Sequence, residues 1–175
     1  MKTLKEYIIE GIFDIEDNIE NLSVESLIED FIKENYEIKG NLQIKKKGNK
    51  YIVSTNGTVV VKNKNITELT NDLFEWGVVG VSFSCRNCTS LESLKGAPEK
   101  VGWGFSCRGC TSLKSLEGAP IEVGEDFRCN GCTSLKSLKY APKKVGENFY
   151  CERCGKKFIE EDVRAVCNVG EVIFV

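Results

Sequence analysis

The chain of 175 residues contains no histidine, and this absence removes several kinds of active site. Without an imidazole there is no Ser-His-Asp or Cys-His nucleophile, and no zinc site that needs a histidine ligand. Proline and methionine are also scarce, with three and one residues. No apolar run is long enough to cross a membrane, and a net charge of −2 argues against electrostatic capture of nucleic acid. We therefore expect neither a membrane nor a nucleic acid as partner.

Other chemical motifs are missing as well. The sequence has no G-x-x-x-x-G-K-[ST] phosphate loop, and its carboxylates fall into no spacing typical of an acid–base pair. These absences predict a protein that is not an enzyme and has no cofactor. The opening residues MKTLKEYIIEG mix Lys with Glu and lack the apolar core of a secretory signal, which predicts a reducing, cytoplasmic location.

Nine cysteines are the abnormal part of the composition, and eight of them belong to a repeat of 22 residues. Three copies begin at Phe83, Phe105 and Phe127, and adjacent copies share 15 of 22 residues. A fourth copy opens at Phe149 and breaks off, and a diverged copy precedes the three at residues 58–80. Copies this short cannot bury a core alone, so the repeat predicts a solenoid in which neighbouring copies cover one another.

Each copy predicts a short strand, a corner and an irregular return segment. Phe105 and Cys107 are two residues apart and are expected to point inward, while Ser106 and Arg108 point outward. Glycine and proline in the second half of each copy are incompatible with a regular helix. The predicted fold class is an α/β repeat solenoid with one parallel sheet and an irregular convex side.

The repeat resembles that of the leucine-rich repeat family. The family pattern is an apolar–x–apolar strand, a ladder position for Asn or Cys, and a leucine; Phe105, Cys107, Cys110 and Leu113 match it, with one extra residue before the leucine. The resemblance covers roughly residues 58–158. It extends to the cysteine-containing repeat proteins that are common in tailed bacteriophages and gut bacteria. It implies a module that binds another protein through its sheet.

The flanking segments are predicted to cap this stack, which would otherwise expose apolar ends. The predicted organisation is an acidic helical segment over residues 1–40, a small β cap over 41–62, the solenoid over 58–158 and a C-terminal cap over 159–175. The helical segment includes an amphipathic helix at 24–36. Asn56-Gly57 predicts a tight turn within the β cap.

The four C-x-x-C pairs allow two interpretations. One is a set of tandem four-cysteine zinc ribbons that bind nucleic acid or protein. The other is a ladder of buried thiols between coils, since cysteine is among the most buried residue types. The second is favoured, because a zinc site does not require copies of everything between its ligands. The alternative zinc ligands are Cys85, Cys88, Cys107, Cys110, Cys129, Cys132, Cys151 and Cys154.

The first ten residues resemble the capsid-targeting leader of internal head proteins in large T-even-type phages. Such leaders are cut after Leu/Ile-x-Glu and before a small residue, and Glu10 followed by Gly11 fits this rule. The resemblance implies packaging inside the phage capsid, delivery to the host cell cytoplasm, and inhibition of a host defence component. The same residues also fit a plain helix that packs on the body of the protein.

The outward strand positions are the candidate partner-binding residues. Arg, Trp and Tyr are the residue types that anchor interfaces. Arg86, Arg108 and Arg128 are expected to form a basic stripe with Trp103 beside it. The predicted partner-binding residues are Ser84, Arg86, Trp103, Ser106, Arg108, Arg128, Asn130, Tyr150 and Glu152.

Overall fold

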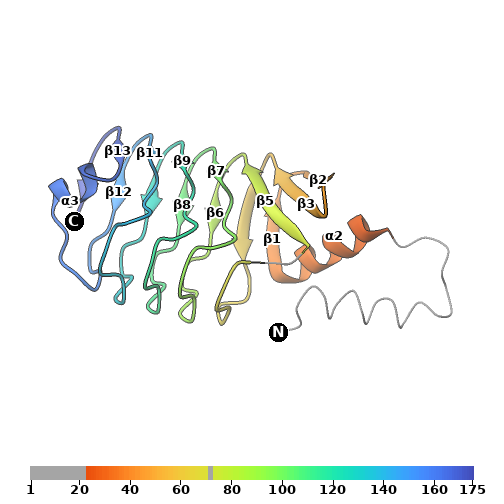
Figure 1. Ribbon diagram of the computed structural model, residues 1–175, viewed down its shortest axis with the longest axis horizontal. Helices are drawn as coiled ribbons and strands as arrows, with labels where there is room; N and C mark the ends of the chain where they lie inside the picture. The colour runs from red at the N-terminus through yellow and green to blue at the C-terminus, as the bar shows by residue number, and fades with distance from the viewer. Residues whose placement is uncertain (1–22, 71–72) are drawn as a thin grey trace.

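The computed structural model describes residues 23–70 and 73–175, which form a β-solenoid of about six turns (Figure 1). The coils lie side by side along the long axis of the molecule, with helix α2 (Val24–Asn35) at one end and helix α3 (Glu160–Arg164) at the other (Figure 1). The predicted stacked-repeat architecture is therefore confirmed. Within the described residues, no helix is long and apolar enough to cross a membrane.

Two seven-stranded sheets run along the solenoid and face each other across its interior. Sheet A contains, in spatial order, β1 (Tyr36–Lys39), β4 (Thr58–Val61), β6 (Phe83–Ser84), β8 (Phe105–Ser106), β10 (Phe127–Arg128), β12 (Phe149–Tyr150) and β14 (Ile173–Phe174). Sheet B contains β13 (Asn168–Val169), β11 (Lys144–Val145), β9 (Glu122–Val123), β7 (Lys100–Val101), β5 (Phe74–Val79), β3 (Lys50–Thr55) and β2 (Leu42–Lys47).

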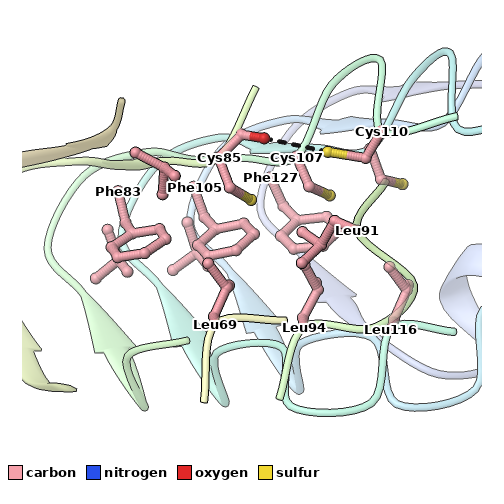
Figure 2. Close-up of a cluster of buried hydrophobic side chains, with 14 of the residues drawn as sticks. Leu69, Phe83, Cys85, Leu91, Leu94, Phe105, Cys107, Cys110, Leu116 and Phe127 are labelled. Atoms are coloured by element: carbon pink, nitrogen blue, oxygen red, sulfur yellow. Dashed lines mark hydrogen bonds between the residues drawn. The ribbon is translucent and has the colours of Figure 1, made fainter. Parts of the chain in front are cut away.

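Identical side chains from successive coils form continuous inner rows. The rings of Phe83, Phe105 and Phe127 are nearly parallel, with centroids 5.6 Å apart at each step. All three are fully buried. Rows of cysteine and leucine side chains lie on either side of this phenylalanine row (Figure 2). Each coil thus covers the apolar side of the next, as the inward positions predicted from the sequence require.

Sheet B was not predicted, because the sequence analysis treated the second half of each copy as an irregular return. Its central strands are only two residues long, and they lie between a proline and a glycine. Pairing between coils, and not strand length, defines them: Val101 pairs with Val123 in parallel register. At the following corner the backbones approach so closely that a Cβ on Gly124 would lie 1.8 Å from the carbonyl oxygen of Gly102. Only glycine fits there.

The C-terminal segment continues the solenoid. β13 pairs with β11 and β14 pairs with β12, both in parallel. Gly170 extends the corner row of glycines, and Ile173 takes the place of the phenylalanine. Helix α3 replaces the leucine-containing turn of the earlier copies, with Val163 as its buried residue. The final residues therefore form one more coil, although their sequence departs from the repeat.

The other end of the solenoid is covered by antiparallel strands and by α2. β1 pairs with β4, and β2 pairs with β3. Asn56-Gly57 does not close a hairpin, since β3 lies in sheet B and β4 in sheet A. Ser23 begins α2 by accepting a hydrogen bond from the backbone N–H of Ser26. The apolar stripe of this helix is buried over the first coils.

Candidate protein-interaction surface

The outer face of sheet A carries eight of the nine predicted partner-binding residues, all except Trp103, in two rows that follow from strand register. The first row, one residue after the phenylalanines, contains Ser84, Ser106, Arg128, Tyr150 and Phe174. The second row lies two residues further along each strand, where interstrand hydrogen bonds continue past the strand ends. It contains Arg86, Arg108, Asn130 and Glu152.

Arg86 and Arg108 lie side by side in the second row. The backbone N–H of Asn87 donates to the carbonyl oxygen of Arg108 at 2.9 Å, so the two arginines are in equivalent places of adjacent coils. Both side chains are exposed, and neither forms a salt bridge with any residue that the structure describes. Two like charges one strand spacing apart repel each other, and no carboxylate among the described residues offsets this repulsion.

Trp103 lies at the corner that leads into β8 and keeps 55% of its surface exposed. Backbone hydrogen bonds place it in a corner row between Val81 and Glu125. The sequence left the direction of this side chain open, and the structure places it outward. An indole with this much exposed surface is the kind of side chain that becomes buried in an interface.

Arg128 belongs to a different environment from the other two arginines. Its guanidinium bonds the carboxylate of Asp126 at 2.6 Å and lies 4.8 Å from the ring centre of Tyr150. The hydrogen bond to Asp126 raises the pKa of Arg128. Tyr150 in turn stacks on Phe174, with ring centres 4.5 Å apart. Arg128 is thus held in place by its own neighbours.

The predicted stripe of three arginines is therefore not a single row. Arg128 directly follows its phenylalanine, whereas Arg86 and Arg108 follow theirs by three residues, so the register separates them. The sequence analysis also missed Phe174, because the last coil carries no recognisable copy of the repeat. Of the three arginines, Arg86 and Arg108 lie side by side without a salt bridge among the described residues, and Arg128 does not join them.

The corner row changes character along the molecule. After Trp103 it continues as Glu125, Glu147 and Glu171, linked by successive backbone hydrogen bonds. Partial burial, together with repulsion from Glu125 and Glu171, raises the pKa of Glu147. The face therefore has a cationic and aromatic part over β6 and β8, and an acidic corner over β10 to β14.

Eight of the nine cysteines are buried and Cys154 is half-buried; the thiols of Cys110, Cys132 and Cys154 donate to backbone carbonyls of the preceding coil. The Cys110 thiol donates to the carbonyl oxygen of Cys85 at 3.1 Å (Figure 2), and Cys132 donates to Cys107 at 3.2 Å. A separate side-chain interaction between the thiols of Cys85 and Cys110, together with burial, raises the pKa of Cys85, and the same thiol–thiol interaction lowers the pKa of Cys110. Burial raises the pKa of Cys88 to about 12.

These contacts give the thiols a structural task. The carbonyl oxygens of Cys85 and Cys107 each accept a backbone N–H from their own coil, and the thiols of Cys110 and Cys132 add a second hydrogen bond from the next coil. Among residues 23–70 and 73–175, no group of three or more Cys, Asp or Glu side chains is arranged to hold a metal ion. The alternative zinc ligands are thus spread along the stack, one pair per coil.

Glu10 and Gly11, the predicted processing site, lie outside the described residues. Comparison with known proteins adds no assignment: neither a protein-family model, nor a curated protein, nor a solved structure matches this chain.

Proposed function

We propose that the chain is a non-enzymatic interaction module that binds another protein through the outer face of sheet A. The observation that carries the proposal is the exposed pair Arg86 and Arg108 on adjacent coils, which has no salt bridge among the described residues; the exposed Trp103 lies at the corner that leads into β8. Tryptophan and arginine are the residue types that are enriched at the centres of protein interfaces. The partner that fits this part of the face is an acidic protein surface with an apolar recess for the indole.

A solenoid suits this task because its backbone is fixed by neighbouring coils. Residues on successive strands keep a constant spacing, so a partner meets a preformed surface and little ordering entropy is lost on binding. Phe83 and Phe105, three residues before these arginines, are fully buried and stack on each other. The face therefore needs no rearrangement to present Arg86 and Arg108.

The test is affinity capture from the natural host with the full chain as bait. The variant Arg86→Glu/Arg108→Glu/Trp103→Ser is expected to lose the captured protein by tenfold or more, with an unchanged melting temperature. The matched control is Lys136→Glu/Lys157→Glu, which reverses two exposed lysines away from this face. Equal capture by the sheet A variant and the wild type would move the interface elsewhere.

The proposal includes a narrower family assignment to leucine-rich repeats of the cysteine-containing, phage type. It is supported by the inter-coil bonds of Cys110 and Cys132, since a side chain that bonds backbone of the adjacent coil is what the Asn or Cys position of that repeat supplies. The other support for this family assignment is the sequence pattern of Phe105, Cys107, Cys110 and Leu113.

We also propose a location for the protein, first inside a phage capsid and then in the host cytoplasm. The leader resemblance at residues 1–10 supports packaging in a phage capsid, entry into the host cytoplasm, and a host defence component as the bound protein. Mass spectrometry of purified phage particles tests it. A chain that starts at Gly11 is expected, and recovery of only the full-length chain would exclude processing at Glu10.

A further inference from the structure

The three near-identical copies provide an internal comparison, because a residue that differs in one copy stands where the same backbone carries another residue in its neighbours. At two positions of the repeat, one copy carries a large, partly exposed apolar or aromatic residue where the other copies carry glycine or a charged residue. The residue before Ala-Pro is Gly96, Gly118 and then Tyr140. The residue after it is Glu99, Ile121 and then Lys143. Tyr140 and Ile121 each keep 50% of their surface exposed.

Tyr140 occupies a backbone conformation that disfavours its side chain. Its φ is +69°, and the two equivalent glycines have a φ of +87°. Bulky residues rarely adopt this left-handed region, which glycine enters freely. Tyr140 is not part of the hydrophobic core, and half of its surface is exposed. A strained, exposed aromatic residue indicates a role outside the fold.

The two divergent residues line the same groove. It lies at the edge of sheet B, between the second and third copies and the C-terminal end of α3. Its floor consists of small apolar residues, Ala119, Pro120 and Ala141, and Ala165 at the end of α3 lines the far side. Such a floor leaves room for an apolar side chain between Ile121 and Tyr140.

Two lysines flank the groove, and neither has a carboxylate partner among the described residues. Glu117, which neighbours Lys139 in the stack, pairs with Lys95 at 3.1 Å. The Lys139 ammonium instead lies 4.8 Å from the ring centre of Tyr140. Ile121 separates Lys143 from Glu99, where a charged residue would have completed an ion-pair row.

We propose that this groove is a second docking site, for an acidic peptide segment of a partner protein that inserts an apolar side chain. Ile121, Tyr140 and the alanine floor hold the apolar side chain, and Lys139 and Lys143 pair with carboxylates on either side of it. The groove is built from sheet B and the return segments, so it is independent of the sheet A surface. Its occupant is selected by charge complementarity and by the small apolar floor.

The test is selection of displayed random dodecapeptides on the full chain, followed by fluorescence anisotropy with the best resynthesised peptide. The selected peptides are expected to place Asp or Glu on both sides of an apolar residue. The variant Ile121→Glu/Tyr140→Gly restores residues that the neighbouring copies already carry, so it is expected to fold. It should weaken peptide binding by tenfold or more, and Lys139→Gln/Lys143→Gln should weaken it and reduce its salt dependence.

Arg86→Glu/Arg108→Glu is the matched control and is expected to leave peptide binding unchanged, which separates this site from the sheet A surface. Melting temperatures of all variants verify folding. Selection of basic peptides, no selection at all, or equal binding by the Ile121→Glu/Tyr140→Gly variant would overturn the proposal. A dimer of the chain that dissociates in the same variant would also overturn it, by making a second copy the occupant.

Discussion

The two outer faces of the solenoid are built from the same short copies, yet their charged residues are arranged differently. On sheet B, Glu122 lies between Lys100 and Lys144 and bonds both, at 3.4 and 3.3 Å. On sheet A, Arg86 and Arg108 are adjacent and unpaired among the described residues. The comparison shows that a stacked repeat can satisfy its own surface by alternating charges between coils. Arg86 and Arg108 lack such a pairing among the described residues.

The largest effect is expected in the interior shared by both faces. Phe105→Ala removes a fully buried ring stacked on both neighbours and should lower the free energy of unfolding by about 3–5 kcal/mol. Val123→Ala, the equivalent truncation beneath sheet B, should lower it by roughly 2 kcal/mol. Urea denaturation measures both.

The adjacent outward residue provides the control for this pair. Ser106→Ala is expected to change the free energy of unfolding by less than about 0.5 kcal/mol. If Val123→Ala proved as damaging as Phe105→Ala, the interior would not be centred on the phenylalanine row.

The second largest effect is expected from alkaline pH, which should lower the free energy of unfolding. The thiols responsible lie next to the strands of sheet A. Burial raises the pKa of Cys88 and of Cys151 to about 12. The folded state therefore binds more protons than the unfolded state above the ordinary thiol pKa near 9. Stability is complete below pH 9 and falls as the pH rises toward 12, by about 1 kcal/mol per such thiol at pH 10.

Urea denaturation at several pH values under reducing conditions measures this loss. Cys110 and Cys154, whose pKa is lowered by bonds to Cys85 and Cys129, oppose it in part. The control is Cys88→Ala, whose stability should depend less steeply on pH. An identical pH profile for this variant would show that the buried thiol does not contribute.

A smaller effect is expected from charge reversal on sheet B. Glu122→Lys places three lysines in one row, so the melting temperature should fall at low salt and recover at high salt. The control is Glu99→Lys, the same charge change at a residue without an ion pair among the described side chains. Equal shifts in the two variants would mean that the Lys–Glu–Lys row does not stabilise sheet B.

No effect is expected from metal removal, if the thiols serve as hydrogen-bond donors. Treatment with a strong chelator should leave the melting temperature unchanged, because Cys110 and Cys132 bond carbonyl oxygens and not an ion. Loss of the folded state on chelation, with metal recovered by elemental analysis, would contradict this assignment and favour the zinc alternative.

Periodicity made the interior predictable from the sequence. Phe105 and Cys107 repeat at a fixed spacing, and the alternation of a strand places both inward. The sequence repeats a Val-Gly pair at Val79, Val101, Val123 and Val145, and the structure places each pair at the end of a strand of sheet B, which was not predicted. A strand of two residues leaves no pattern within its own length, so it becomes visible only through the pairing of Val101 with Val123.

The surface was less predictable, because it depends on register between coils. The separation of Arg128 from Arg108 follows from a difference of two residues within the copy. The last coil was missed because Ile173 replaces the phenylalanine and α3 replaces the leucine turn. The groove beside Tyr140 was missed because its two apolar residues are ordinary when each is considered alone.

The glycine corners set how this molecule can change in length. Successive repeat coils approach each other most closely at their corner glycines, as at Gly102 and Gly124. The backbone of one 22-residue copy can therefore stack on either side of another copy. The surface is more selective: a tandem duplicate of residues 105–126 would set Glu122 against its own copy. The apolar interior is therefore compatible with added coils. The surface charges favour only those orders of copies in which opposite charges are adjacent.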